Sequence, residues 1–196
     1  MGNREDLLAG ARRCLLEKGY ARTTVRDIAT AAGGVSMAAI GYHFGSKEAL
    51  LNEALAEANR EWGVELERAL TEARRPDSAP LDRFAASWSA VIDSIGTHRG
   101  LWAATFDTIA QAGHDPATKD QLAARMAEAR GGLADLLADA DADPDADPHA
   151  ADPRKAQALG AFYQILLTGL AAQCLIDPEH APTGADLAAA IREVTE

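Results

Sequence analysis

The chain has 196 residues, of which 47% are hydrophobic, and this suits one or two small domains with a proper apolar core. Its two cysteines, Cys14 and Cys174, lie far apart in predicted helices, so they indicate buried thiols in a reducing compartment rather than a disulfide framework. The net charge of -11 argues against a protein that binds nucleic acid over its whole surface.

The charge is unevenly distributed. Residues 1–51 carry seven basic and five acidic residues, whereas the remaining residues carry 12 basic and 25 acidic ones. A basic head on an acidic body is expected where only one end of a protein meets a polyanion. The charged N-terminal segment leads into no apolar signal core, so we expect a cytoplasmic protein.

Apolar residues recur at helical spacing along almost the whole chain, and no stretch alternates as a strand would, so the sequence predicts an all-α fold. Helices are expected near residues 4–18, 24–32, 36–43, 47–73, 81–96, 99–111, 116–138, 155–176 and 183–194. The first four are bounded by clear signals. Thr24 and Asp27 form a capping-box pattern, and Ser36 and Ser46 can cap the third and fourth helices.

Gly33 and Gly34 break the chain between the second and third helices. Two short helices joined by a tight, glycine-containing turn are typical of a helix-turn-helix, which places its second helix in the major groove of DNA. The side chains expected at this interface are Thr24, Arg26, Ser36, Met37, Ala38, Ala39, Tyr42, His43 and Lys47. Ser36, Tyr42, His43 and Lys47 suit phosphate oxygens. Met37, Ala38 and Ala39 offer bases only apolar contacts, and Arg26 is the nearby side chain able to hydrogen-bond guanine.

Several blocks in this region resemble, in the same order, the signature of TetR-type (tetracycline-repressor-like) regulators. The blocks are Gly19-Tyr20, Thr23-Thr24-Val25-Arg26-Asp27-Ile28-Ala29, Ala32-Gly33, Val35-Ser36, Tyr42-His43-Phe44 and Ser46-Lys47-Glu48-Ala49-Leu50-Leu51. The resemblance implies an all-helical homodimer with a DNA-binding domain at 1–50 and a helical effector-binding and dimerisation domain at 51–196. It also implies a palindromic operator and a small effector that releases the DNA.

Three positions depart from the family pattern. The turn has two glycines, Gly33 and Gly34, where the family has one, which could rotate the recognition helix. Ala39 replaces the usual threonine, and Gly41 replaces an aromatic phosphate contact that neighbouring Tyr42 can supply. These departures bear on the DNA contacts rather than on the fold.

The body offers a candidate effector pocket, an apolar site with a few orienting polar groups. Its expected residues are Trp88, His98, Trp102, Thr105, Phe106 and Gln111. They predict a hydrophobic or aromatic effector, with ordinary helix packing as the alternative. Residues 139–153 form an acidic low-complexity segment that mimics a calcium loop, but Ala146 and Asp152 break that pattern, so no metal or cofactor is expected.

Residues 155–176 are apolar on nearly every side, which fits either a membrane span or a helix buried on two faces. Gln164, Thr168 and Gln173 favour the buried helix, with one face against its own domain and the other against a second copy of the chain. The side chains expected in that dimer seam are Phe162, Leu166, Gly169, Leu170, Leu187 and Ile191.

Two other classes of function have less support in the sequence. The chain has no nucleophile elbow, dinucleotide-binding or phosphate-loop motif and no closely spaced His or Cys set, so an enzyme is not expected. A helical ligand-binding scaffold without DNA binding is the second alternative. The sequence favours a repressor that binds double-stranded operator DNA, a small effector and a second copy of itself, with the helix at 47–73 as the lever between its two ends.

Overall fold

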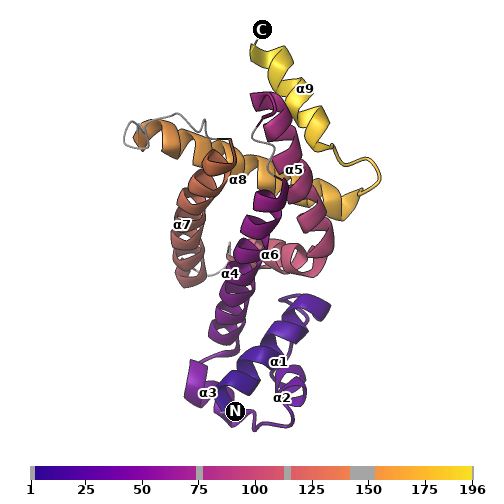
Figure 1. The fold of residues 1–196 in the computed structure, drawn as a ribbon. Coiled ribbons are helices and arrows are strands. Elements are labelled where there is room, and N and C mark those ends of the chain that lie inside the picture. Colours follow the sequence, from indigo (N-terminus) through magenta and orange to yellow (C-terminus); the bar gives the residue numbers. More distant parts are fainter. Residues whose placement is uncertain (1–2, 74–76, 113–115, 142–152, 196) are drawn as a thin grey trace. The chain divides into compact units, whose positions relative to one another are not determined.

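The computed structural model describes residues 3–73, 77–112, 116–141 and 153–195 (Figure 1). Within these residues the structure has nine α-helices and no strand, so the all-α prediction is confirmed. The helices are α1 Asn3–Lys18, α2 Val25–Ala31, α3 Ala38–Phe44, α4 Lys47–Ala73, α5 Pro80–Thr97, α6 Arg99–Ala112, α7 Pro116–Asp141, α8 Pro153–Ile176 and α9 Gly184–Thr195.

The chain folds as two compact units. Unit 1 comprises residues 1–63 and 98–116, and unit 2 comprises residues 64–97 and 117–196. Helix α4 contributes to both, because the division falls after Gly63. The domain boundary expected near residue 50 stays a prediction.

Unit 1 packs α1 against α2, α3 and α6. Gly10 permits the close approach of α1 and α2, since a Cβ there would lie 2.8 Å from the backbone nitrogen of Ala32. Gly100 does the same for α6, where a Cβ would lie 2.6 Å from the carbonyl oxygen of Leu16. The core of this unit is formed by fully buried aliphatic side chains, among them Leu7, Leu15, Ile28, Leu50 and Leu51. Helix α6 therefore belongs to the compact unit that holds the helix-turn-helix, which the sequence did not predict.

Unit 2 is built on α5, which packs against α8 and α9; Figure 1 shows α9 running beside α5. Trp88 is buried, and its ring centroid lies 5.9 Å from that of Phe84 and 6.1 Å from that of Tyr163. Between α7 and α8, the Arg130 Nε donates to Gln164 Oε1 at 3.1 Å, and the Gln164 amide donates to the carbonyl of Met126 at 3.0 Å.

Helix α8 is long and apolar enough, by length and composition alone, to cross a membrane, with a mean hydropathy of 1.6. One such helix is weak evidence for a membrane protein, because core helices of soluble proteins have the same composition. The buried face of α8 carries Tyr163, Leu167, Leu170 and Cys174, and it packs against α5 within unit 2. One face of this helix was expected to pack against its own domain in this way.

Residues 142–152 of the calcium-like segment lie outside the described residues. Its first residues, Asp139 to Asp141, form the end of α7. Within the described part of the chain, no group of three or more His, Cys, Asp or Glu residues is placed to hold a metal ion.

Candidate nucleic-acid interface

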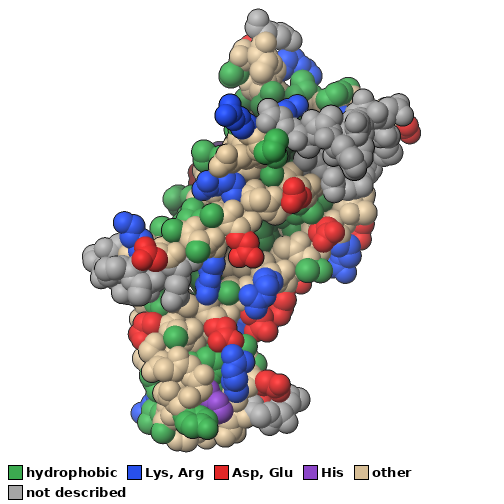
Figure 2. Space-filling model, turned by 90° about the vertical axis from the view of Figure 1, so that its left-hand side faces the viewer, with side chains coloured by type: hydrophobic (Ala, Val, Ile, Leu, Met, Phe, Trp, Pro, Cys, Tyr) green, Lys and Arg blue, Asp and Glu red, His purple; other side chains and the backbone are tan. Residues whose placement is uncertain are grey.

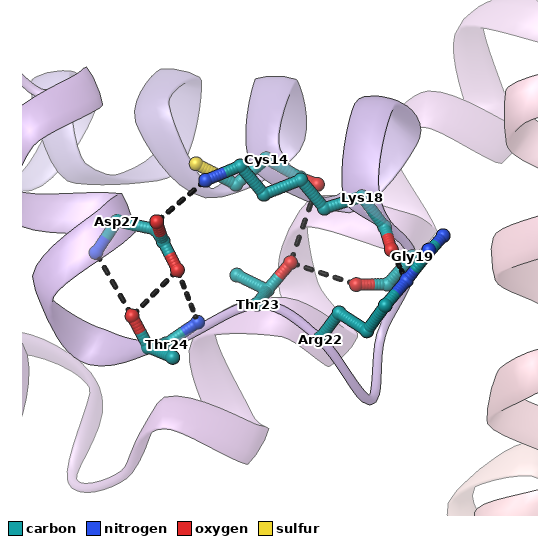
Figure 3. Close-up of polar contacts among 7 residues, drawn as sticks. All are labelled: Cys14, Lys18, Gly19, Arg22, Thr23, Thr24 and Asp27. Carbon is teal, nitrogen blue, oxygen red and sulfur yellow. Dashed lines mark hydrogen bonds and ion pairs between the residues drawn. The ribbon is translucent and has the colours of Figure 1, made fainter.

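The start of α2 is fixed by the predicted capping box. The Asp27 backbone N–H donates to Thr24 Oγ1 at 3.1 Å, and the Thr24 backbone N–H donates to Asp27 Oδ2 at 2.9 Å. The other carboxylate oxygen of Asp27 pairs with the Lys18 ammonium at 2.5 Å (Figure 3). The Lys18 ammonium and the Thr24 donors together hold the pKa of Asp27 far below its ordinary value. The helix start is thereby tied to the end of α1.

A second tie was not predicted, and it lies one residue earlier. Thr23 is buried, and its hydroxyl donates to the carbonyl oxygens of Gly19 at 2.7 Å and Cys14 at 3.2 Å (Figure 3). Arg22 Nε donates to the carbonyl of Lys18 at 2.7 Å. The Lys18 and Gly19 carbonyls lie at the end of α1, where the helix leaves carbonyl groups without partners, and these bonds satisfy them. The threonine pair before α2 was the sequence signal for this contact.

The doubled glycine of the turn closes α2. The Gly34 N–H donates to the Ala29 carbonyl at 2.9 Å and the Gly33 N–H to the Thr30 carbonyl at 3.2 Å, which is the pattern of a Schellman motif. Gly33 and Gly34 have φ of 81° and 85°, so both occupy the left-handed region that favours glycine. Whether the extra residue rotates the recognition helix stays a prediction.

The recognition helix α3 begins at Ala38, two residues after the expected cap. Ser36 Oγ accepts from the Ala38 N–H at 3.3 Å, and Met37, the residue that precedes the helix, makes no side-chain cap. Ile40 faces the core, whereas Met37 is 55% and Tyr42 86% exposed. His43 is half-buried, and its ring meets that of Tyr42 edge-on at 4.9 Å.

Lys47 lies at the first position of α4, where the Ser46 hydroxyl caps the helix by accepting from the Ala49 N–H at 3.0 Å. The Lys47 ammonium donates to the carbonyl of Thr23 at 3.3 Å and lies 3.4 Å from the Glu48 carboxylate. This side chain, expected on a phosphate, here joins the start of α4 to the segment before α2.

Most other cations of the head are also engaged with protein groups. Arg4 pairs with Glu53 at 2.6 Å and its guanidinium lies 5.0 Å from the Phe44 ring centroid, while Arg12 pairs with Glu61. Arg13 donates to the Ala31 carbonyl at 2.5 Å. The lower end of Figure 2, where α1 to α3 lie, accordingly shows few Lys or Arg atoms among hydrophobic and uncharged ones.

The expected effector residues are divided between the two units. Trp88 belongs to unit 2, whereas His98, Trp102, Thr105, Phe106 and Gln111 belong to unit 1. Trp102 is 7% exposed and meets the Trp62 ring edge-on at 5.2 Å. Its indole N–H is buried and has no hydrogen-bond partner in the described part of the chain. Thr105 donates to the Leu101 carbonyl at 2.9 Å. The pocket itself stays a prediction.

The expected dimer residues differ in how accessible they are. Phe162 and Gly169 are exposed, and Leu166, Leu187 and Ile191 are half-buried. Leu170 is only 3% exposed, so its side chain packs within its own unit. Ile165 and Ile176, which the sequence did not single out, are 71% and 85% exposed on the same helix.

Comparison with known proteins gives the family. The family model described as bacterial regulatory proteins, tetR family, matches residues 7–54, and that of the tetracyclin repressor-like C-terminal domain matches residues 79–196. The HTH-type transcriptional repressor AcnR of Corynebacterium glutamicum is 45% identical over 90 residues, which cover 45% of this chain and 46% of that protein. AcnR of Corynebacterium efficiens is 48% identical over 50 residues, 26% of either chain. The matched segments thus span less than half of these relatives.

Solved structures agree over nearly the whole chain. A TetR-family transcriptional regulator from Rhodococcus sp. has a TM-score of 0.66 at 23% identity, covering 99% of this chain and 98% of its own. The multidrug binding protein EbrR, complexed with imidazole, has a TM-score of 0.64 at 26% identity, covering 97% of this chain and 86% of its own. The helix-turn-helix, the all-helical fold and the two matched family domains together place this chain in the tetR family of bacterial transcriptional regulators.

Proposed function

We propose that this chain is a cytoplasmic transcriptional repressor that binds a palindromic operator as a homodimer and leaves it when a small hydrophobic or aromatic effector binds. The observation that carries the proposal is the capped helix-turn-helix of α2 and α3, with an exposed face on α3, within a chain of the tetR family. Such a helix docks in the major groove.

Phosphate binding falls to residues around this helix. The Tyr42 hydroxyl is well placed to donate to a phosphate oxygen because the side chain is almost fully exposed. Thr24, Ser36 and His43 lie at or beside the starts and ends of the two short helices, and they are further candidates. Lys47 would exchange the Thr23 carbonyl for a phosphate oxygen, and that exchange trades a neutral acceptor for a charged one.

A homodimer is supported by the surface of α8. Phe162, Ile165, Gly169 and Ile176 recur at spacings of three, four and seven residues, so they share one face of the helix, and all four are exposed in the single chain. Large apolar side chains exposed together on one helix face indicate a surface that binds another protein. A second copy supplies an identical face, and its two-fold symmetry matches a palindromic operator.

An effector is supported by the buried Trp102 N–H, which lacks a partner among the described residues. A buried donor of this kind costs free energy unless an acceptor satisfies it. EbrR, at 26% identity, is a multidrug binding protein, which fits a hydrophobic or aromatic ligand. The effector would act by binding better when the two heads leave successive major grooves, and DNA affinity must then fall by the same factor. Helix α4 is the proposed lever because it contributes to both units.

The proposal is tested by gel shift with DNA upstream of the chain's own gene and with duplexes selected from random sequence. We expect a salt-sensitive complex with a palindrome. Candidate effectors should quench tryptophan fluorescence and dissociate that complex at the same concentrations. The Trp102→Ala, Phe106→Ala double variant should keep the complex and lose the effector response.

Two results would contradict the proposal. The absence of any complex at low salt would favour a helical ligand-binding scaffold, and an unchanged effector response in the double variant would move the effector site elsewhere.

A further inference from the structure

The exposed face of the recognition helix offers little hydrogen bonding. Met37, Ala38, Gly41 and Tyr42 occupy one continuous arc and are all exposed, whereas Ala39 is half-buried beside the buried Ile40. Of these exposed side chains, only Tyr42 carries a polar group. Met37 and Ala38 can contact bases only through apolar atoms, and in the major groove the apolar feature of a base pair is the thymine 5-methyl group.

The cations of the head restrict base reading further. Six of the seven Lys and Arg residues between positions 3 and 51 are engaged with protein groups, namely Arg4, Arg12, Arg13, Lys18, Arg22 and Lys47. Arg26, the second residue of α2, is exposed, and no hydrogen bond or ion pair joins its guanidinium to any described residue. Within residues 3–51, its guanidinium is therefore the one cationic donor that DNA can take without displacing a described protein partner. Such a fork fits the O6 and N7 acceptors of guanine.

From these two observations, and on the basis of the operator binding proposed above, we infer that thymine methyl groups and a single guanine specify the operator half-site. Met37 and Ala38 contact the methyl groups, and Arg26 reads the guanine. The half-site accordingly contains a G·C pair close to one or more thymines. The other head cations position the protein and carry no base preference.

The first test alters only the DNA and uses the unmodified protein. A palindrome selected from random duplexes is resynthesised with each half-site thymine replaced in turn by uracil, which removes the 5-methyl group and keeps base pairing. At one or two positions, affinity should fall about 4-fold, the worth of one buried methyl. Met37→Ala should remove that penalty at its position. Equal affinity for every uracil-substituted duplex would overturn the methyl contacts, while the salt-sensitive complex itself would still support operator binding.

The second test concerns Arg26. Arg26→Ala should lower the preference for guanine at one half-site position roughly 5- to 150-fold, the range for a bidentate contact. Replacing that guanine by 7-deazaguanine should weaken binding of the unmodified protein and have no further effect on the variant. Arg60→Ala is the matched control, because Arg60 is an exposed arginine on α4 with the same charge. It should leave the guanine preference intact.

An unchanged guanine preference in Arg26→Ala, or equal binding of unmodified protein to the 7-deazaguanine duplex, would overturn the assignment of Arg26. Circular dichroism of both variants establishes that they fold. Failure of operator binding itself is a different result, because the unmodified protein would then select no palindrome.

Discussion

At the scale of single residues, the turn before α3 depends on backbone conformation rather than on space. A Cβ at Gly33, Gly34 or Gly41 would meet no other atom within 4 Å, so added bulk would cause no clash at any of them. Gly33 and Gly34 nevertheless have positive φ, which Gly41, inside α3, does not. An added methyl group should therefore destabilise the fold at Gly33 or Gly34 but not at Gly41.

Gly34→Ala should destabilise unit 1 by about 1–2 kcal/mol, because an L side chain in the left-handed region crowds its own backbone. Gly41→Ala is the control and should stabilise the helix by up to about 1 kcal/mol, since alanine is the better helix former. Thermal and urea unfolding of the two variants, followed by circular dichroism, measures both effects. Equal destabilisation by the two substitutions would mean that packing, not φ, makes these positions glycine.

Asp27 predicts a pH dependence. Its pKa in the folded protein lies below the ordinary value of 3.8, because the Lys18 ammonium and the Thr24 donors favour the carboxylate. A carboxyl group whose pKa is lower in the folded than in the unfolded protein stabilises the fold at pH values above its unfolded-state pKa. That stabilisation is lost as the pH falls from the unfolded-state pKa through the folded-state pKa. Thermal unfolding between pH 6 and pH 2 should show a steep loss below about pH 4 that is reduced in Asp27→Asn.

Asp186 is the matched control for this titration. It sits in an equivalent capping box with Thr183, and its pKa is also lowered, but the Thr183 hydroxyl and backbone are the causes and no ammonium group contributes. Asp186→Asn should therefore flatten the acid limb less than Asp27→Asn. The same slope for both variants would show that the Lys18 pair adds nothing to the capping box.

At the scale of elements, local signals determined what could be predicted. The boundaries of α4 follow from the Ser46 cap and from Arg75 and Pro76, and the capping boxes at Thr24 and Thr183 follow from the spacing of threonine and aspartate. Contacts between distant segments carry no such signal. Two such contacts join α6 to α1 within unit 1. Gly100 lies close to Leu16, and the Tyr20 N–H donates to Asp107 at 3.1 Å.

The residues of the candidate DNA-binding site also divide into those that local sequence predicts and those that it does not. The helix-turn-helix and its exposed Met37 and Tyr42 could be predicted from the capping and apolar pattern. The engagement of Lys47 with the Thr23 carbonyl could not, because nothing in either local sequence indicates the partner. The same holds for the burial of Leu170, since a helix that is apolar on every side does not show which face meets its own core.

The ion pairs between α1 and α4 give a prediction for DNA binding. Arg4–Glu53 and Arg12–Glu61 are partly exposed, so each adds at most about 1 kcal/mol to stability. Glu53→Gln should free Arg4, beside Phe44 of the recognition helix, for phosphate. Affinity for all duplexes should rise about equally at low salt, and the salt slope should steepen by about one charge.

Glu61→Gln is the control for that change, because it breaks the same kind of pair without freeing a cation that touches α3. Fluorescence anisotropy titrations at several salt concentrations measure both slopes. Identical slopes for Glu53→Gln and the unmodified protein would mean that Arg4 does not reach the DNA even when its carboxylate partner is gone.

At the scale of the whole molecule, the proposed homodimer would form through the exposed face of α8. Ile165 and Ile176 are 71% and 85% exposed, and burying one isoleucine side chain is worth about 1.5–3 kcal/mol. Because two-fold symmetry brings each residue into the interface twice, a charge at either position acts on both chains at once. If the operator has the two proposed half-sites, DNA affinity would depend on this interface, although α8 lies in unit 2 and the helix-turn-helix in unit 1.

Ile165→Glu and Ile176→Glu should each raise the dimer dissociation constant at least tenfold, because the cost of burying an unpaired carboxylate adds to the loss of the buried isoleucine. Val64→Glu is the matched control, since Val64 is an exposed aliphatic residue, 67% exposed, on a different helix, α4. Sedimentation velocity should show monomers for the two α8 variants and dimers for the control. Operator affinity should fall with dimerisation and recover as protein concentration rises, whereas binding to a single half-site should not change. Dimers that persist in both α8 variants would place the interface on another surface.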